Sequence, residues 1–233
     1  MSYGHLPSPS PASETLWELL RGRAERQPDR RGFTFLLDGE TAEENLDYGE
    51  LDRRARAVGA RLQSLGAAGE RVLLLYPPGL DYVAAVFGCL YAGAVAVLAF
   101  PPRLNRLTAR LQSIAADAQP KVALSTAKVV ASLGQRAAEA PELGRLHWLA
   151  TDELPSGIEA DWREPRVDRD ALAFLQYTSG STGNPKGVML SHGNVLHNLG
   201  LIQRGFDVHA DGDRGVIWLP IYHDMGLIGG VLE

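Results

Sequence analysis

The chain has 233 residues, 45% of them hydrophobic and 22% charged, so it can bury a full core and fits an ordinary globular protein of one or two domains. Its 23 basic and 28 acidic residues give a formal net charge of -5, which argues against a nucleic acid or an anionic membrane surface as partner. The single cysteine, Cys89, excludes a disulfide framework and a cysteine-based metal site, and a reducing, cytoplasmic setting fits best.

The first 12 residues are expected to be a flexible leader. They are rich in Pro and Ser and lack the basic start and apolar centre of a secretory signal. A later segment, residues 83–100, has 18 residues without a charge, which is the threshold length for a spanning helix. Gly88, Gly93 and the Val-rich second half favour a buried helix, a turn and a buried strand instead. We therefore expect no membrane span.

The first folded elements are a helix and a hairpin. Capping-box spacing and a following proline predict a helix over residues 15–27. A strand over residues 33–37 should enter a tight turn at Asp38 and Gly39, both with positive φ, and pair with a second strand near Leu46.

A βαβ unit follows. Apolar residues at helical spacing predict an amphipathic helix over residues 48–65, closed by Gly66. The uniformly apolar strand 71–76 should lie in the centre of a parallel sheet with both faces covered. A helix over residues 80–92 and a strand over 94–99 complete the unit.

The same alternation continues to residue 178. It predicts a helix spanning residues 104–114, a strand over 121–125, a short helix ending at Gly134, and strands over 146–150 and 171–178. This order is typical of a doubly wound α/β architecture, with a mostly parallel sheet and flanking helices.

The stretch "YTSGSTGNPKGVMLSH", residues 177–192, contains a glycine-rich loop with the composition of an oxyanion site. Glycines allow close backbone approach, hydroxyls stand beside consecutive amide donors, and a lysine adds a full charge. The residues concerned are Thr178, Ser179, Gly180, Ser181, Thr182, Gly183, Lys186 and Gly187. A surface turn without a ligand would have a similar composition, so composition alone leaves both readings open.

This loop is not a nucleoside-triphosphatase P-loop. That motif needs Gly before its Lys and Ser or Thr after it, at the start of a helix, whereas Pro185 precedes Lys186 and Gly187 follows it. Residues 188–191 favour an extended chain, and helix signals begin only at Asn194, a candidate N-cap. The loop should therefore join two strands.

The order of these elements, with a TSGSTGxPKG loop between two strands, resembles the phosphate-binding signature of the adenylate-forming superfamily. Within it, "FTFLLDGE", "FPPR" and "WLPIYHDMGLIGGVLE" are similar to fatty acyl-AMP ligases, which typically feed polyketide or peptide assembly lines. The resemblance runs from about Ser13 to Glu233. It covers well under half of a complete member, so we expect an incomplete N-terminal domain that is inactive alone.

The resemblance implies a ligase that activates a fatty acid with ATP and Mg²⁺ to acyl-adenylate and pyrophosphate, and passes the acyl group to an acyl carrier protein. Fatty acyl-CoA synthetase and a non-catalytic scaffold or sensor remain alternatives. It also implies that Lys186 and the loop residues Thr178, Ser179, Gly180, Ser181, Thr182 and Gly183 hold the β- and γ-phosphates. His223, expected after a strand "GVIWLP", would lie near the carboxylate and α-phosphate, unless it is satisfied by local backbone groups.

Other candidates are weaker. His192 and His197 share no helical face, and Asp211 and Asp213 flank a turn glycine, so neither pair predicts a metal site. Trp218 and Tyr222 are expected in core packing rather than in a pocket wall, and Asp224 should brace its loop. Asp47 and Leu98 depart from the family pattern at positions that look peripheral to the chemistry.

Overall fold

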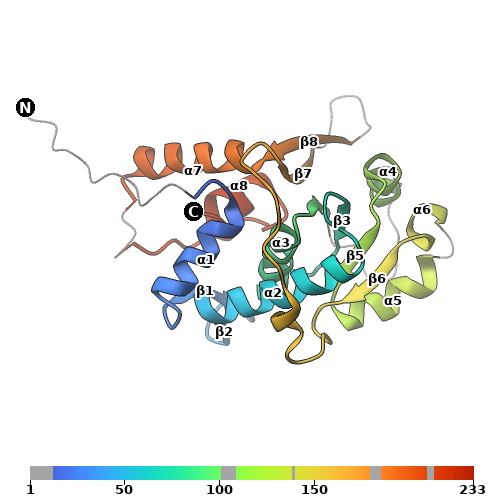
Figure 1. Ribbon diagram of the computed structural model, residues 1–233, viewed down its shortest axis with the longest axis horizontal. Helices are drawn as coiled ribbons and strands as arrows, with labels where there is room; N and C mark the ends of the chain where they lie inside the picture. The colour runs from blue at the N-terminus through green and yellow to red at the C-terminus, as the bar shows by residue number, and fades with distance from the viewer. Residues whose placement is uncertain (1–12, 101–108, 138–139, 179–184, 209–212) are drawn as a thin grey trace, which may run out of the picture.

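The computed structural model describes residues 13–100, 109–137, 140–178, 185–208 and 213–233. Its centre is a six-stranded sheet in the order β6-β5-β3-β4-β7-β8 (Figure 1). The strands are β3 (Arg71–Leu74), β4 (Val95–Leu98), β5 (Val122–Ser125), β6 (His147–Ala150), β7 (Leu172–Thr178) and β8 (Lys186–Ser191). All neighbours are parallel except β7 and β8, which are antiparallel. The predicted doubly wound α/β class is confirmed.

Helices cover both faces of this sheet. The core on one face includes residues of α1 (Leu16–Arg26), α2 (Tyr48–Ser64), α3 (Leu80–Ala92) and α7 (His192–Phe206). The other face is covered by α4 (Ala109–Ala118), α5 (Ala127–Ala137) and α6 (Pro141–Gly144). Successive residues of β3 separate accordingly, because Val72 and Leu74 face the first core and Leu73 faces the second. The prediction that β3 is central and covered on both sides is confirmed.

Two helices begin as the sequence predicts. The Thr15 hydroxyl accepts from the backbone N–H of Glu18, whose carboxylate accepts from Thr15 N, and this capping box starts α1. Asp47, one of the departures from the family pattern, caps α2 by accepting from Glu50 N at 2.7 Å. At the end of α3, Gly93 adopts the left-handed conformation with φ 67°.

The small hairpin β1 (Arg31–Leu36) and β2 (Glu43–Asp47) exists, but its predicted tight turn is wrong. Leu37–Ala42 form a longer loop in which only Gly39 has positive φ. The Asp38 carboxylate accepts three backbone N–H bonds, from Glu40, Thr41 and Ala42, at 2.9 to 3.0 Å. A side chain therefore replaces the backbone turn that the sequence suggested.

Two further predictions are corrected, and part of a third is not tested. The helix expected to end at Gly134 continues to Ala137, since a glycine weakens a helix without ending it. The cap of α7 is Ser191, three residues before Asn194, which completes a capping box instead. Leu104 and Leu107 of the predicted helix lie outside the described residues.

The segment "GVIWLP", residues 215–220, is not a strand. None of the described strands pairs with it, and an unpaired extended segment cannot satisfy a ladder of hydrogen bonds. Trp218 is accordingly 87% exposed, so its predicted place in the core is wrong. After this segment come α8 (Asp224–Gly226) and the π-helix η2 (Leu227–Val231), whereas η1 (Ile158–Asp161) lies earlier, in the connection from β6 to β7.

No helix among the described residues is long and apolar enough to span a bilayer. Residues 83–100 divide instead into most of α3, a turn at Gly93, and β4, as predicted. Cys89 is fully buried on α3, and burial raises the pKa of its thiol well above the ordinary value, which suits packing rather than nucleophilic chemistry.

Candidate functional site

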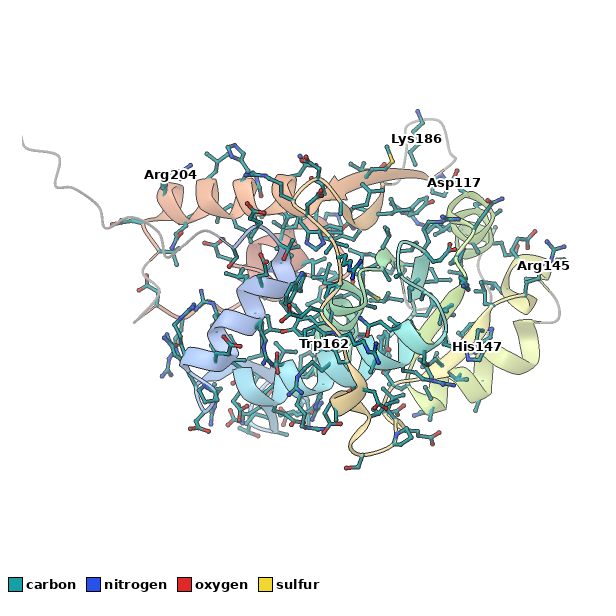
Figure 2. The ribbon with its side chains drawn as sticks, viewed as in Figure 1. Asp117, Arg145, His147, Trp162, Lys186 and Arg204 are labelled. Atoms are coloured by element: carbon teal, nitrogen blue, oxygen red, sulfur yellow. The ribbon has the colours of Figure 1, made fainter. Side chains whose placement is uncertain are left out.

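The glycine-rich loop joins β7 to β8, as the sequence predicts. Thr178 at the end of β7 pairs with Lys186 at the start of β8, and both side chains are exposed. Figure 2 shows Lys186 at the outer end of this hairpin, directed away from the body of the sheet. Ser179, Gly180, Ser181, Thr182 and Gly183 lie outside the described residues. The structure thus places the two ends of the predicted phosphate-binding loop.

Strand alternation sets the face to which these ends belong. Phe174 lies in the core shared with α7, and Leu175 and Tyr177 lie in the opposite core. Because side chains alternate along a strand, Gln176 and Thr178 share the face of Phe174. Directly opposite residues of a strand pair share a face, so the Lys186 side chain leaves β8 on that face too.

Tyr177 fixes the base of the loop from the other face. Its hydroxyl donates to the Asp117 carboxylate of α4, and Arg110 of the same helix donates to the Tyr177 carbonyl at 3.3 Å. Burial, and then the bond to Asp117, raise the pKa of Tyr177, so the phenol keeps its proton and remains a donor. Figure 2 shows Asp117 and Lys186 at the same end of the molecule. α4 therefore holds the strand that enters the loop.

Gly187, at the start of β8, packs against the ring of Tyr177. A Cβ at this position would lie 3.0 Å from Cζ of Tyr177 and 3.2 Å from its Cε2. The aromatic ring thus occupies the space above β8 where any side chain would project. Packing of the Tyr177 ring therefore favours glycine as the last residue of the PKG motif.

The segment that carries His223, residues 220–228, packs on the edge of the sheet where the parallel strands end. The Tyr222 ring lies 4.2 Å, centroid to centroid, from the ring of Phe100, which follows β4. The Gln176 side chain donates its Nε2–H to the Tyr222 carbonyl at 2.9 Å. Ligands of open α/β sheets bind outside this edge. His223 is therefore held next to the ends of β4 and β7, and β7 is the strand that enters the predicted phosphate-binding loop.

His223 itself is exposed and oriented by its neighbours. Its Nδ1 contacts Oδ1 of Asp224, which also accepts from Met225 N at 2.7 Å. A carboxylate has no proton to donate, so a hydrogen bond at this contact places a hydrogen on Nδ1 and leaves Nε2 for a ligand. Holding an anion at Nε2 then requires both ring nitrogens to carry hydrogen. Asp224 thereby braces the loop in the way the sequence suggests.

The other candidates have structural positions. His192 is buried on α7 and its Nδ1 accepts from Leu16 N at 3.1 Å. In the described part of the chain, no group of three or more His, Cys, Asp or Glu side chains is placed to hold a metal ion. Asp211 lies outside the described residues. One surface hollow of about 430 Å³ lies beside Leu149 and Ile158, away from the hairpin.

Comparison with known proteins places the chain in a family. Residues 20–232 match the family model described as "AMP-binding enzyme". The chain belongs to the AMP-binding enzyme family. It is 41% identical to the medium-chain-fatty-acid acyl-carrier-protein ligase JamA of Moorena producens over 96% of this chain and 38% of JamA. It is 36% identical to the long-chain-fatty-acid AMP ligase FadD32 of Mycobacterium marinum over 91% of this chain and 33% of FadD32.

A solved structure agrees with these sequence matches. The fatty acyl-adenylate ligase from L. pneumophila, crystallised in complex with acyl adenylate and pyrophosphate, superimposes with a TM-score of 0.84 at 38% identity. The match covers 94% of this chain and 38% of that one. The chain thus spans little more than a third of the length of the relatives it matches.

Sequence reasoning missed three residues that organise this site. Gln176 gave a usable signal, because it is the only strongly polar side chain inside the apolar strand "LAFLQYT". Asp117 and Arg110 gave none, since they lie about 60 residues from Tyr177 on a helix of ordinary composition. Only the packing of α4 against the sheet brings them to the loop.

Proposed function

We propose that this chain provides the pyrophosphate-binding hairpin and part of the acyl-binding edge of a ligase that activates a fatty acid with ATP. The fatty acid carboxylate would attack the α-phosphorus, forming a mixed anhydride and releasing pyrophosphate. The thiol of an acyl carrier protein would then attack the acyl carbon, forming a thioester and releasing AMP. The observation that carries this proposal is the hairpin that pairs Thr178 with Lys186 beside the tethered His223 segment.

The residues act by position and charge. Lys186 would neutralise the charge that grows on the leaving pyrophosphate, and the loop amides and hydroxyls would share that role. Thr178, Ser179, Gly180, Ser181, Thr182 and Gly183 form the proposed loop contacts. His223 would hold the incoming carboxylate or the α-phosphate through Nε2. No protein nucleophile is needed, which agrees with the buried, protonated Cys89.

Mg²⁺ is expected with ATP, but the described residues do not form a site for it. They contain no cluster of carboxylate or imidazole ligands. When bound, the ion would supply further charge neutralisation at the phosphates. We therefore assign no residue of the described part of this chain to it.

Calorimetric titration tests whether the chain binds the phosphates of the nucleotide. The chain should bind pyrophosphate and ATP, and binding should weaken in Lys186→Ala. For an enzyme containing this chain, fatty-acid-dependent exchange of labelled pyrophosphate into ATP should occur, with carrier-protein thiol preferred over CoA as acceptor. If neither pyrophosphate nor ATP binds at millimolar concentration, a non-catalytic module is the better description. A preference for CoA would instead indicate an acyl-CoA synthetase.

A further inference from the structure

Gln176 is an unusual residue for its position. It lies on β7 between β4 and β8, is 8% exposed, and its neighbours along the strand are apolar. Its Oε1 is buried and has no hydrogen-bond partner among the described residues. A leucine would suit this core position better, because burying half of an amide without a partner is unfavourable. Departures of this kind from the apolar pattern are expected at functional positions.

The paired half of the amide explains the departure. Gln176 Nε2 donates to the backbone carbonyl of Tyr222, the residue directly before His223. The two amide orientations are not equivalent, since the reverse would set Oε1 against another acceptor. The bond therefore fixes the amide and leaves Oε1 unpaired as a consequence.

Leu227 is fully buried in the core shared with α7, and Ile221 and Ile228 pack against that core, so polar contacts are not the whole of what holds the His223 segment. His223 N donates to Pro220 O and Leu227 N to His223 O, but both bonds lie within the segment itself. The flanking residues 213–218 are exposed. The Gln176 amide and the Phe100–Tyr222 ring contact are the links to β7 and to the end of β4.

We infer that Gln176 is a positioning residue, which ties the His223 segment to the strand that enters the phosphate loop. On this view β7 sets the position of a fatty acid carboxylate at His223 relative to a pyrophosphate at Lys186. Gln176, which holds the His223 segment, lies on that strand two residues before Thr178. The inference deepens the proposed function and rests on it for its catalytic meaning. The tether itself can be measured without a ligand.

The test uses amide hydrogen exchange in Gln176→Leu and Gln176→Glu. Leucine removes the donor, and glutamate removes it when ionised, so exchange is measured at a pH above the raised pKa that burial gives this carboxyl. We expect exchange over residues 220–228 to accelerate at least about threefold in both, while exchange over 172–177 stays as in the wild type. Tyr222→Phe keeps the carbonyl and the ring, and it should leave both peptides unchanged.

Unchanged exchange over residues 220–228, in either variant that keeps β7 protected, would overturn the inference. Lost protection over both peptides in both variants would also overturn it, because Gln176 would then serve the sheet as a whole. Failure of the proposed function would be seen separately, as a wild-type chain that binds neither ATP nor pyrophosphate. In an enzyme containing this chain, the tether predicts a lower kcat in Gln176→Leu with the KM for ATP changed less than about twofold.

Discussion

The ring of Tyr177 lies against the backbone of Gly187, so that a Cβ on Gly187 would stand 3.0 Å from the ring. The two residues are cross-strand partners at the base of the proposed phosphate loop. Tyr177 is held in turn by Asp117 of α4. Packing at this one pair therefore links the geometry of the hairpin to a helix on the far face of the sheet.

Gly187→Ala should destabilise the chain by about 1 to 2 kcal/mol, because the ring must shift and strain its bond to Asp117. Urea unfolding measures this change. Gly205→Ala on α7 is the matched control, since a Cβ there meets nothing within 4 Å, and it should be neutral or stabilising. Equal stability of Gly187→Ala and the wild type would show that Tyr177 does not fill this space tightly.

Lys186→Ala should lower acyl-adenylate formation more than about tenfold in an enzyme containing this chain, because the leaving pyrophosphate loses a charge partner. Steady-state kinetics with a fatty acid and ATP give this value. Lys128→Ala is the control, as it removes an exposed lysine from α5, beside the opposite edge of the sheet. Wild-type rates in Lys186→Ala would remove the proposed role.

Asp52→Asn should cost roughly 2 to 4 kcal/mol of stability. The Asp52 side chain is 4% exposed, and its carboxylate accepts from Arg21 at 3.1 Å, Arg56 at 2.8 Å and the Tyr91 hydroxyl at 2.8 Å. Loss of the charge leaves two arginines poorly compensated.

Asp81→Asn provides the comparison for this measurement. Asp81 is 45% exposed and 3.5 Å from Arg54, so the substitution should change the unfolding free energy by less than about 1 kcal/mol. Equal effects of the two substitutions in urea unfolding would contradict the importance of the buried network.

His192 should make stability depend on pH. Burial lowers its pKa to about 4, against a smaller opposing effect of Glu18 and Asp168, because the charged ring is poorly solvated. The pKa of a histidine in an unfolded chain is about 6.5. Between these values the unfolded state binds more protons, so stability is present above pH ~6.5 and is lost as pH falls toward 4. Linkage gives a loss of about 2 kcal/mol from this group between pH 7.5 and pH 5.

His192→Gln separates this effect from other titrations. Its amide oxygen can accept from Leu16 N, as Nδ1 of His192 does, but it does not titrate. Urea unfolding at both pH values should show a smaller loss in the variant. The same loss in both proteins would assign the pH dependence to other groups.

The sequence by itself determined the local elements and the order in which they alternate. Helix caps at Thr15 and Asp47, the fully apolar β3 and the strand–loop–strand motif around Lys186 depend on neighbours in the chain, and local physical chemistry suffices for them. Prediction from the sequence failed where the structure of a segment depends on a partner that is distant in the chain. The strand expected at residues 215–220 has no paired neighbour among the described strands, and Trp218 is therefore exposed.

Only the tertiary structure decided what surrounds the strand that enters the proposed phosphate loop. Tyr177 meets Asp117 across 60 residues, and Gln176 meets Tyr222 across 46. No periodicity or motif in the sequence predicts either pairing. Both pairings arise from the way α4 and the His223 segment pack on the assembled sheet. The sequence thus predicts which residues carry charge, and the packed sheet determines which groups hold them in place.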